Sequence, residues 1–463
     1  MNRSDFKLWI SLFTLLAVCL SVNVHSQAEP LYEGFWETEG YGYIFGIQKK
    51  TVTIYEKTAI SCLVSGLSSG KLNNTEPQAA PYFHVAIPGF INARMEIYQR
   101  SDSSNDLVFH RTDTNTWMVA KRVSSLPEQC SATPNPALAL EVFVQNFREH
   151  YPFLLRNPAF IGEVNSDHKK FTGQPLFDEI KSLLRKLEDP HTALFAPDID
   201  QLFLGNELPK PQVPTASELA TIKRRVEAHY VVGNVETLNE QMRLGQLPDG
   251  LSYLAVDGFW GLSKEGTANA ERLAMEAALP KILKALKSSK GLVIDLRAHS
   301  GGSDKLGIQL AGIFTKKDYL AYRKQFVIEG GVDPKWQEGM PIMVRSIGGS
   351  SWAGQIAILT SPATVSAGEA FVMALEQRYP RVKRVGEKTR GSFSDMLPRT
   401  LPNGWLFSLP NERYLDAAGK SFDFIGIEPH LYVEDVLGES ENSRRDRVLE
   451  AAMDFLLQSP SNH

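Results

Sequence analysis

The sequence is poor in cysteine and shows no excess of positive charge. Only three of its 463 residues are cysteines, and neither Cys62 nor Cys130 has a second Cys or His at the spacing of a zinc site. Lys and Arg number 49 against 53 Asp and Glu, which gives a net charge of -4. Without a basic stripe, nucleic acid is not an expected partner. The sequence implies no metal and no organic cofactor.

Several common catalytic and nucleotide-binding motifs are also missing. A G-x-S-x-G nucleophile elbow around Ser366 would need Gly at position 364, where the chain has Thr364. A phosphate loop, a dinucleotide-binding fingerprint and an H-E-x-x-H zinc motif are absent from the sequence as well. These absences argue against an α/β-hydrolase, a P-loop enzyme, a Rossmann enzyme and a zinc peptidase.

The N-terminus carries the one long apolar run. "MNRSDFK" is followed by "LWISLFTLLAVCL", Leu8 to Leu20, and then by small residues at Ser26 and Ala28. This three-part pattern is typical of a secretory signal peptide, and the run is short for a membrane span. We expect a signal peptide over residues 1–28, cleavage near its end, and export to the periplasm or the medium. The alternative is an uncleaved membrane anchor; no later run is long enough to span a bilayer.

Export would place the remaining cysteines in a compartment that permits disulfides. Removal of the signal peptide leaves Cys62 and Cys130. The sequence leaves two interpretations open, a Cys62–Cys130 bridge or two buried thiols, because distance cannot be deduced from spacing.

The residue pattern of the mature chain changes three times. Residues 29–132 alternate aromatic and β-branched residues between polar turns, which predicts a small antiparallel β barrel or sandwich. Residues 133–249 follow two prolines and show helical spacing. Residues 250–440 alternate strand-like and helix-like runs, which predicts βαβ units and a largely parallel sheet. Residues 441–463 form a C-terminal helix and tail. The predicted fold class is a multi-domain α/β protein.

Two stretches of the 250–440 region place potentially catalytic groups at a turn. "TVSAGEAF" places Ser366 at the start of a helix, where S-x-x-E also fits a capping box with Glu369. Ser366 is therefore either a cap or a nucleophile at a helix N-terminus. "DLRAHSGG" ends a buried strand with Gly301 and Gly302, which form either a tight turn or a site where backbone N–H groups face a ligand.

These stretches belong to an ordered set of motifs: "DLRAHSGG", "ILTSPATVSAGEAF", "VGEKTRGSF", "LPNGW" and "GIEPHL". The set resembles the C-terminal processing peptidase superfamily, which includes tail-specific proteases, the tricorn protease core and the interphotoreceptor retinoid-binding protein. The resemblance covers about residues 250–434 and, more weakly, "LEDPHTALF". It implies a crotonase-like or Clp-protease-like α/β core in which Ser366 is the nucleophile.

The superfamily uses two kinds of base, and the sequence favours one of them. Tail-specific members carry a lysine after "GEKTxG", but this chain has Ser392 there, with Lys388 four residues earlier. Tricorn-like members use a histidine from a preceding region, and "LEDPHTALF" supplies His191. The resemblance then assigns Asp423, ahead of "GIEP", as the acid that orients His191 in a Ser-His-Asp arrangement.

The resemblance implies an exported serine peptidase that acts on peptides or proteins. Backbone N–H groups of Gly301 or Gly302 and of Ala367 would form the oxyanion hole. His299 stands where the family often has Asn, as a turn residue, a substrate donor or a rival base. His430 replaces the usual Asp of "GIEPD". The alternative function is non-catalytic binding of an apolar ligand or peptide, as the retinoid-binding relatives show for this fold.

Overall fold

The structure is a computed structural model, and it describes most of the chain after the N-terminal region. The described residues are 32–67, 70–73, 80–87, 91–100, 105–157, 160, 171–205, 213–379, 381–434 and 443–458. The expected signal peptide, residues 1–28, lies outside them. The chain divides into two units, Met1–Glu33 and Gly34–His463, and the second contains all the described helices and strands. Within its described residues, no helix is both long and apolar enough to cross a bilayer.

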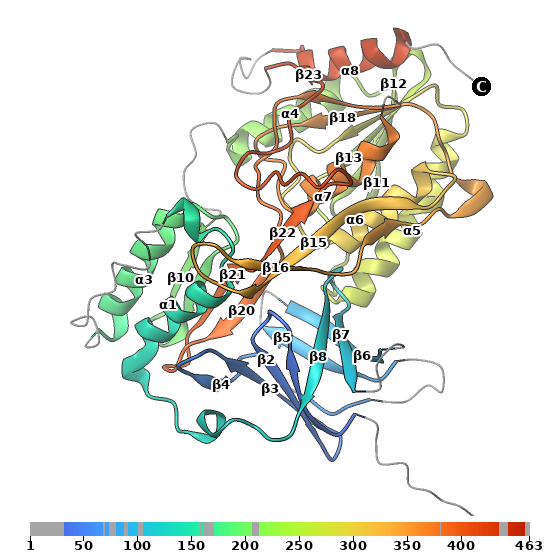
Figure 1. Cartoon of the computed structure of the whole chain (residues 1–463). Coiled ribbons are helices and arrows are strands. Elements are labelled where there is room, and N and C mark those ends of the chain that lie inside the picture. The colour runs from blue at the N-terminus through green and yellow to red at the C-terminus, as the bar shows by residue number, and fades with distance from the viewer. Residues whose placement is uncertain are drawn as a thin grey trace, which may run out of the picture. The chain divides into compact units, whose positions relative to one another are not determined.

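The first strands form one antiparallel sheet of eight, drawn in blue and cyan in Figure 1. Its order is β4-β3-β2-β1-β8-β7-β6-β5. Alternate residues are buried, as in β3, because successive side chains of a strand point to opposite faces. The antiparallel β region expected from the sequence is therefore present as a half-barrel. The strands are β1 (Gly34–Thr38), β2 (Tyr43–Gln48), β3 (Thr51–Lys57), β4 (Cys62–Val64), β5 (Tyr82–Ile87), β6 (Ile91–Gln99), β7 (Asp106–Arg111) and β8 (Trp117–Val123).

A disulfide links the edge of this sheet to the segment that leaves it. Cys62 opens β4 and bonds to Cys130, with their Cα atoms 4.5 Å apart. Of the two interpretations left open by the sequence, the structure contains the bridge. The bridge thus links strand β4 to the segment that follows the β region and precedes the helical region.

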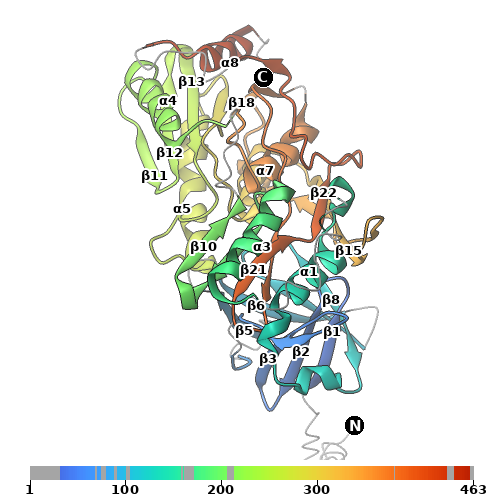
Figure 2. The ribbon, with the colours of Figure 1, turned by 90° about the vertical axis from the view of Figure 1, so that its left-hand side faces the viewer.

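The second region contains two amphipathic helices and a small sheet. Helix α1 (Ala139–His150) and helix α3 (Gly173–Leu187) pack on strands β9 (Ala193–Ala196) and β21 (Leu406–Pro410) through one apolar cluster. Figure 2 shows the two helices beside β21. The sheet order is β10-β9-β21-β20, with β10 (Gln201–Leu204) and β20 (Met396–Thr400) at its edges. Its strands come from two distant parts of the chain. The region expected to be helical thus also contains strands, which pair with residues that come after the nucleophile candidate.

The core is a mixed seven-stranded sheet with helices on both faces. Its order is β11-β12-β13-β14-β18-β19-β23, and it is parallel from β13 onward. The first two strands precede residue 250, so the sheet begins earlier than the expected core. The strands are β11 (Glu236–Asn239), β12 (Met242–Leu247), β13 (Leu251–Val256), β14 (Leu292–Asp295), β18 (Ile356–Thr360), β19 (Val382–Gly386) and β23 (Leu431–Tyr432).

Two apolar clusters explain the layering. One face of the sheet packs on three helices, α5 (Ala268–Leu286), α6 (Asp304–Ala311) and α7 (Ala367–Leu375). The other face packs on α4 (Ala216–His229) and α8 (Arg447–Gln458). Because residues face both layers, every residue of β13, β14 and β18 is buried, the pattern expected of a central parallel strand.

A fourth sheet runs beside the core and reaches the β region. The long strand β15 (Tyr319–Glu329) pairs with β16 (Lys335–Glu338), β17 (Ile342–Val344) and β22 (Glu412–Leu415). Phe326 of β15 contacts the ring of Tyr41, with centroids 5.0 Å apart. The candidate site lies among the loops that these sheets hold together.

Candidate active site

Ser366 lies in a strained turn between strand β18 and helix α7. Its φ of 57° and ψ of -120° are unfavourable for a residue with a side chain. Such strain persists only where surrounding contacts impose it, and it is common at functional sites. The Ser366 N–H lies 3.0 Å from the Ser392 carbonyl oxygen and 3.1 Å from Glu369 Oε2. The backbone of Ser366 therefore fixes the turn.

His191 reaches Ser366 from the end of helix α3. The helix stops at Glu188, which is left-handed with φ 51°, and the chain turns through Asp189. The His191 N–H donates to Asp189 Oδ1 at 3.0 Å, while Tyr151 donates its hydroxyl to Asp189 Oδ2 at 3.0 Å. His191 Nε2 lies 3.2 Å from Ser366 Oγ, across 175 residues of sequence. The structure thus brings together the two residues that the motifs single out.

Ser392 occupies the other side of the imidazole ring. Its Oγ lies 2.8 Å from His191 Nδ1. For Nε2 to accept the Ser366 proton, Nδ1 must carry the ring hydrogen and donate it to Ser392 Oγ. Burial lowers the pKa of His191, against the opposing effect of Asp189 and Asp395. The lowered pKa favours the neutral ring that a general base requires.

Asp423 does not take the place beside His191 that the resemblance assigns to it. Its Oδ2 accepts a 2.7 Å hydrogen bond from Ser421, and its N–H donates back to the Ser421 hydroxyl at 3.3 Å. Asp423 also accepts a hydrogen bond from the backbone of Phe393, next to Ser392, so it lies near the loop of Ser392 and yet is not bonded to His191 within the described residues. Burial raises the pKa of Asp423 to about 7, with Ser421 opposing the shift. The Nδ1 position that an orienting acid would occupy belongs to Ser392.

Glu369 joins the nucleophile turn to the loop that carries Ser392. Its Oε1 accepts from Thr389 Oγ1 at 2.5 Å and from Gly391 N–H at 2.6 Å. Its Oε2 accepts from the N–H groups of Ser392 at 2.8 Å and Ser366 at 3.1 Å. The cap pattern in the sequence explains only the bond to Ser366. The three other bonds make Glu369 the residue that places Ser392 next to His191.

The glycine turn lies against Ser366. A Cβ atom on Gly301 would lie 3.1 Å from Ser366 Cβ, and φ is 99° at Gly301 and 117° at Gly302. Glycine is required here because the backbone is left-handed and the approach is close. Gly301 N–H, however, donates to His299 Nδ1 at 3.1 Å, so it is engaged within the turn.

Two other N–H groups remain available beside the nucleophile. Gly302 forms a parallel bridge with Phe259, made by Phe259 N–H to Gly301 O and Ser303 N–H to Phe259 O, so its own N–H points the opposite way. Ala367 is the first residue of helix α7, where N–H groups lack an intrahelical acceptor. For neither group does the described part of the chain supply a hydrogen-bond partner. Of the three N–H groups expected from the sequence, that of Gly301 is thus bonded within the turn, whereas those of Gly302 and Ala367 have no bond within the described residues.

Lys388, His299 and His430 form no hydrogen bond with Ser366 or His191 within the described residues. The side chain of Lys388 is exposed, and His299 is fully buried, with its Nδ1 accepting from the Gly301 N–H. His430 is exposed and stacks on Tyr379. Among the described residues, no group of three or more His, Cys, Asp and Glu is arranged to hold a metal ion.

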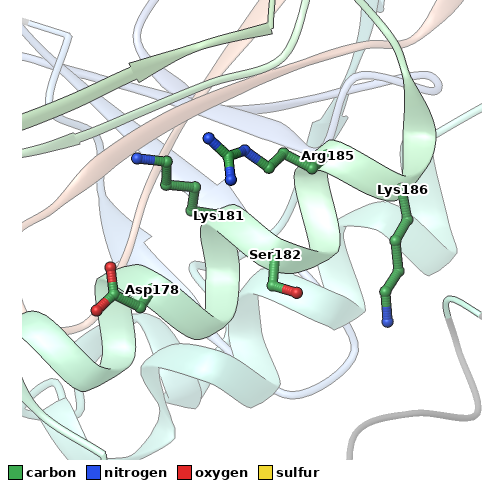
Figure 3. Close-up of a pocket in the computed structure, with 5 residues that line it drawn as sticks. All are labelled: Asp178, Lys181, Ser182, Arg185 and Lys186. Carbon is green, nitrogen blue, oxygen red and sulfur yellow. The ribbon is translucent and has the colours of Figure 1, made fainter. Parts of the chain in front are cut away.

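A pocket on helix α3 lies away from the site. Figure 3 shows its lining side chains, which are Asp178, Lys181, Ser182, Arg185 and Lys186. Neither His191 nor Ser366 lines it. It therefore contributes nothing to the chemistry of the Ser366–His191 pair.

Comparison with known structures finds a protein of similar fold and several weaker matches. A putative peptidase from Parabacteroides merdae ATCC 43184 is 22% identical with a TM-score of 0.57, and the match covers 71% of this chain and 98% of that chain. A lipoprotein from Streptococcus agalactiae is 15% identical with a TM-score of 0.42, over 72% of this chain and 98% of that one. The photosystem II D1 C-terminal processing protease is 15% identical with a TM-score of 0.37, over 64% and 92%. No match is found among curated proteins.

Comparison with protein-family models identifies the core. The model of peptidase family S41 matches residues 251–433, which include the glycine turn, Ser366 and Ser392. Residues 251–433 therefore form a peptidase family S41 region, and this family consists of serine-type peptidases.

Proposed function

We propose that this protein cleaves peptide bonds with Ser366 as nucleophile and His191 as general base. The observation that carries the proposal is the 3.2 Å separation between His191 Nε2 and Ser366 Oγ. That distance is within hydrogen-bond reach, so the neutral imidazole can accept the hydroxyl proton as Oγ attacks the scissile carbonyl. The imidazolium then protonates the departing amine, and water, activated by the same ring, hydrolyses the acyl-enzyme.

Ser392 takes the orienting role in this proposal. Its Oγ, 2.8 Å from Nδ1, accepts the ring N–H and keeps the lone pair of Nε2 directed at Ser366. A hydroxyl stabilises the imidazolium less than a carboxylate does, because it has no charge. Asp189 supplies the nearby negative charge, and it raises the pKa of His191 against the larger effect of burial.

The N–H groups of Gly302 and Ala367 form the oxyanion hole in this proposal. Ala367 follows Ser366 in the chain, and Gly302 follows Gly301, whose Cβ position lies 3.1 Å from Ser366 Cβ. Donors aimed at the developing oxyanion stabilise it most where water is excluded. The positive end of the α7 helix dipole at Ala367 adds to this stabilisation. Each such donor contributes about 10²- to 10³-fold to kcat in enzymes of this chemistry.

The remaining parts of the chain fit this function. The core from residue 250 to 440 would be the crotonase-like or Clp-protease-like catalytic domain. Residues 29–132 and 133–249 would close the site, the latter by supplying His191. We also propose export after cleavage near Ser26 to Ala28. Sequencing the N-terminus of the mature protein tests this, because an intact Met1 would indicate an anchor instead.

A fluorophosphonate probe and a casein digest test the proposed site. The wild type should form one covalent adduct on Ser366, and the Ser366→Ala and His191→Ala variants should lose both labelling and hydrolysis while they remain folded. Lys388→Ala is the matched control and should keep full activity, because that side chain is exposed. Loss of activity in Lys388→Ala with activity retained in His191→Ala would overturn the proposed base. A folded wild type with neither labelling nor hydrolysis would support the non-catalytic binding protein instead.

A further inference from the structure

Trp260 is a large apolar side chain exposed beside the glycine turn. It follows strand β13 in the loop Asp257–Trp260, and 54% of its surface is exposed. Its neighbour Phe259 is only 1% exposed and packs against Phe371 of helix α7. The loop therefore buries one aromatic ring in the core and presents the next one at the surface.

The exposed indole is held in place. Its Nε1–H donates to Ser300 Oγ at 2.9 Å, and the Ser300 hydroxyl donates to the Asp257 carbonyl oxygen at 3.1 Å. A Cβ atom on Gly258 would lie 3.0 Å from Nε1, so the ring packs closely on that glycine. Because its one polar group is already bonded, the remaining exposed surface of the ring is wholly apolar.

The backbone of Trp260 lies against Gly302, one of the two residues of the proposed oxyanion hole. A Cβ atom on Gly302 would lie 2.8 Å from the Trp260 backbone nitrogen, and one on Gly301 would lie 3.1 Å from Ser366 Cβ. The two glycines alone therefore separate the backbone of Trp260 from the nucleophile. A peptide whose carbonyl occupies the proposed oxyanion hole therefore lies near the backbone of Trp260.

We propose that Trp260 determines specificity by contacting a large apolar side chain that flanks the scissile bond. The inference rests on the proposed function and narrows its substrate class to peptides with Leu, Phe or a similar residue at the cleavage site. A rigid tryptophan suits this role because it offers a large contact area at a small cost in conformational entropy. Its bonded N–H leaves no donor to favour a polar residue instead.

The test uses a set of fluorogenic peptides that differ only in the two residues on either side of the scissile bond. Wild type should cleave peptides with Leu or Phe at one of these positions faster than peptides with Ser or Ala. Trp260→Ala should lower kcat/KM for the large apolar peptides by about 10- to 100-fold and leave the others within about twofold. Trp260→Phe should fall between the two.

Two further variants keep the test decisive. Ser300→Ala removes the acceptor of the indole N–H, so it should weaken the same preference while Trp260 remains, even if Trp260→Ala fails to fold. Tyr379→Ala is the matched control, because Tyr379 is 55% exposed but lies beyond the opposite end of helix α7 from Ser366. It should leave the preference unchanged.

Labelling by the fluorophosphonate probe separates the two hypotheses. The probe has no peptide side chain, so Trp260→Ala should be labelled at the wild-type rate. Normal labelling with an unchanged side-chain preference in Trp260→Ala, Trp260→Phe and Ser300→Ala would overturn the role of Trp260 and leave the proposed function intact. Absence of labelling in the wild type would instead remove the proposed function itself.

Discussion

Two buried carboxylate clusters hold the same loop, residues 389–395, by different means. In the Glu369 cluster, one carboxylate accepts four hydrogen bonds from the uncharged groups of Ser366, Thr389, Gly391 and Ser392. Burial raises the pKa of Glu369 to about 7, and the donors only partly oppose it. No ammonium or guanidinium group is bonded to it among the described residues.

The Lys324 cluster has a cation at its centre. Lys324 Nζ lies 3.0 Å from Asp304 Oδ2, 2.8 Å from Asp395 Oδ2 and 3.7 Å from Glu412 Oε2. Burial alone would lower the pKa of Lys324, but the three carboxylates raise it well above its ordinary range. Burial disfavours the charged form of Asp395, yet Lys324 holds its pKa below the ordinary value. Thr116 Oγ1, from the turn between β7 and β8, completes the cluster.

The two clusters differ in role: the Glu369 cluster positions the residues of the site, and the Lys324 cluster anchors parts of the fold to one another. The Glu369 cluster is bonded to Ser366 and Ser392, so its bonds set the distances at the site. The Lys324 cluster joins strand β15, helix α6 and the β region through the ion pairs of Lys324 and the hydroxyl of Thr116. We therefore expect changes in the first to reduce kcat and changes in the second to reduce stability.

Lys324→Met should have the largest effect, and this effect should be a loss of stability. The variant leaves three carboxylates close together without their cation, and breaking a buried ion pair on one side costs about 3–5 kcal/mol of unfolding free energy. Urea denaturation followed by circular dichroism measures the loss. Lys335→Met is the control, since its pair with Glu329 is exposed and contributes under about 1 kcal/mol. Equal losses in the two variants would show that the Lys324 cluster is not an anchor.

Glu369→Gln should act on catalysis. The amide nitrogen of Gln would face N–H or O–H donors where an oxygen now accepts them, so the loop must shift away from Ser366. A displacement near 1 Å at Ser392 would lower kcat by about 10²-fold with little change in KM. Steady-state kinetics on one peptide measures both constants, with Glu428→Gln, an exposed residue, as control. A raised KM with unchanged kcat would place Glu369 in substrate binding instead.

Glu369 and Asp395 should respond to pH in opposite directions, whereas burial raises the pKa of Glu412 in the Lys324 cluster as it raises that of Glu369. The pKa of Glu369 is about 7 in the folded protein against an ordinary 4.5, so the folded state binds more protons between these values. Its contribution therefore lowers the unfolding free energy as pH rises from about 4.5 to about 7, and it is constant above that. The lowered pKa of Asp395 has the opposite effect on the unfolding free energy. The charged carboxylate stabilises the fold above pH 3.8, and this stabilisation is lost as the pH falls below 3.8.

Urea midpoints at several pH values from 4.5 to 8 sharpen this contrast. Asp423, whose pKa burial also raises to about 7, contributes to the wild-type curve, so the difference between wild type and Glu369→Gln isolates Glu369. The wild type should lose stability relative to the variant as pH rises to 7. A constant difference over this range would mean that Glu369 keeps an ordinary pKa.

Local motifs account for the part of the site that the sequence can predict. Ser366 begins a helix in a short S-x-x-E pattern, and His191 follows the end of another in "DPHT". Each position depends on turn chemistry within a few residues, so each is visible in the sequence. Their partnership over 175 residues is predicted only through the family resemblance.

Long-range contacts account for the part that the sequence cannot predict. In the sequence, Ser392 is only the place of a missing lysine, because serine is common and its role depends on Glu369 holding the loop. The resemblance assigns Asp423 as the orienting acid, whereas in the structure Asp423 bonds to Ser421 and His191 Nδ1 faces Ser392. The strands β9 and β21 likewise pair across more than 200 residues, and neither alternates long enough to be recognised alone.

Thr116→Val gives the smallest effect and tests how the β region is joined to the core. The hydroxyl of Thr116 donates to Asp395 Oδ2 at 2.6 Å and lies 3.0 Å from Glu412 Oε1. Valine keeps the shape but removes these two contacts and the 3.3 Å contact from Lys324 Nζ. Because Lys324 still neutralises Asp395, we expect a loss of about 1 kcal/mol in unfolding free energy and no change in kcat. Thr51→Val, on the exposed face of β3, should change neither. A fall in kcat for Thr116→Val without a loss of stability would mean that the turn between β7 and β8 positions the 389–395 loop, and that the Lys324 cluster, like the Glu369 cluster, serves the site.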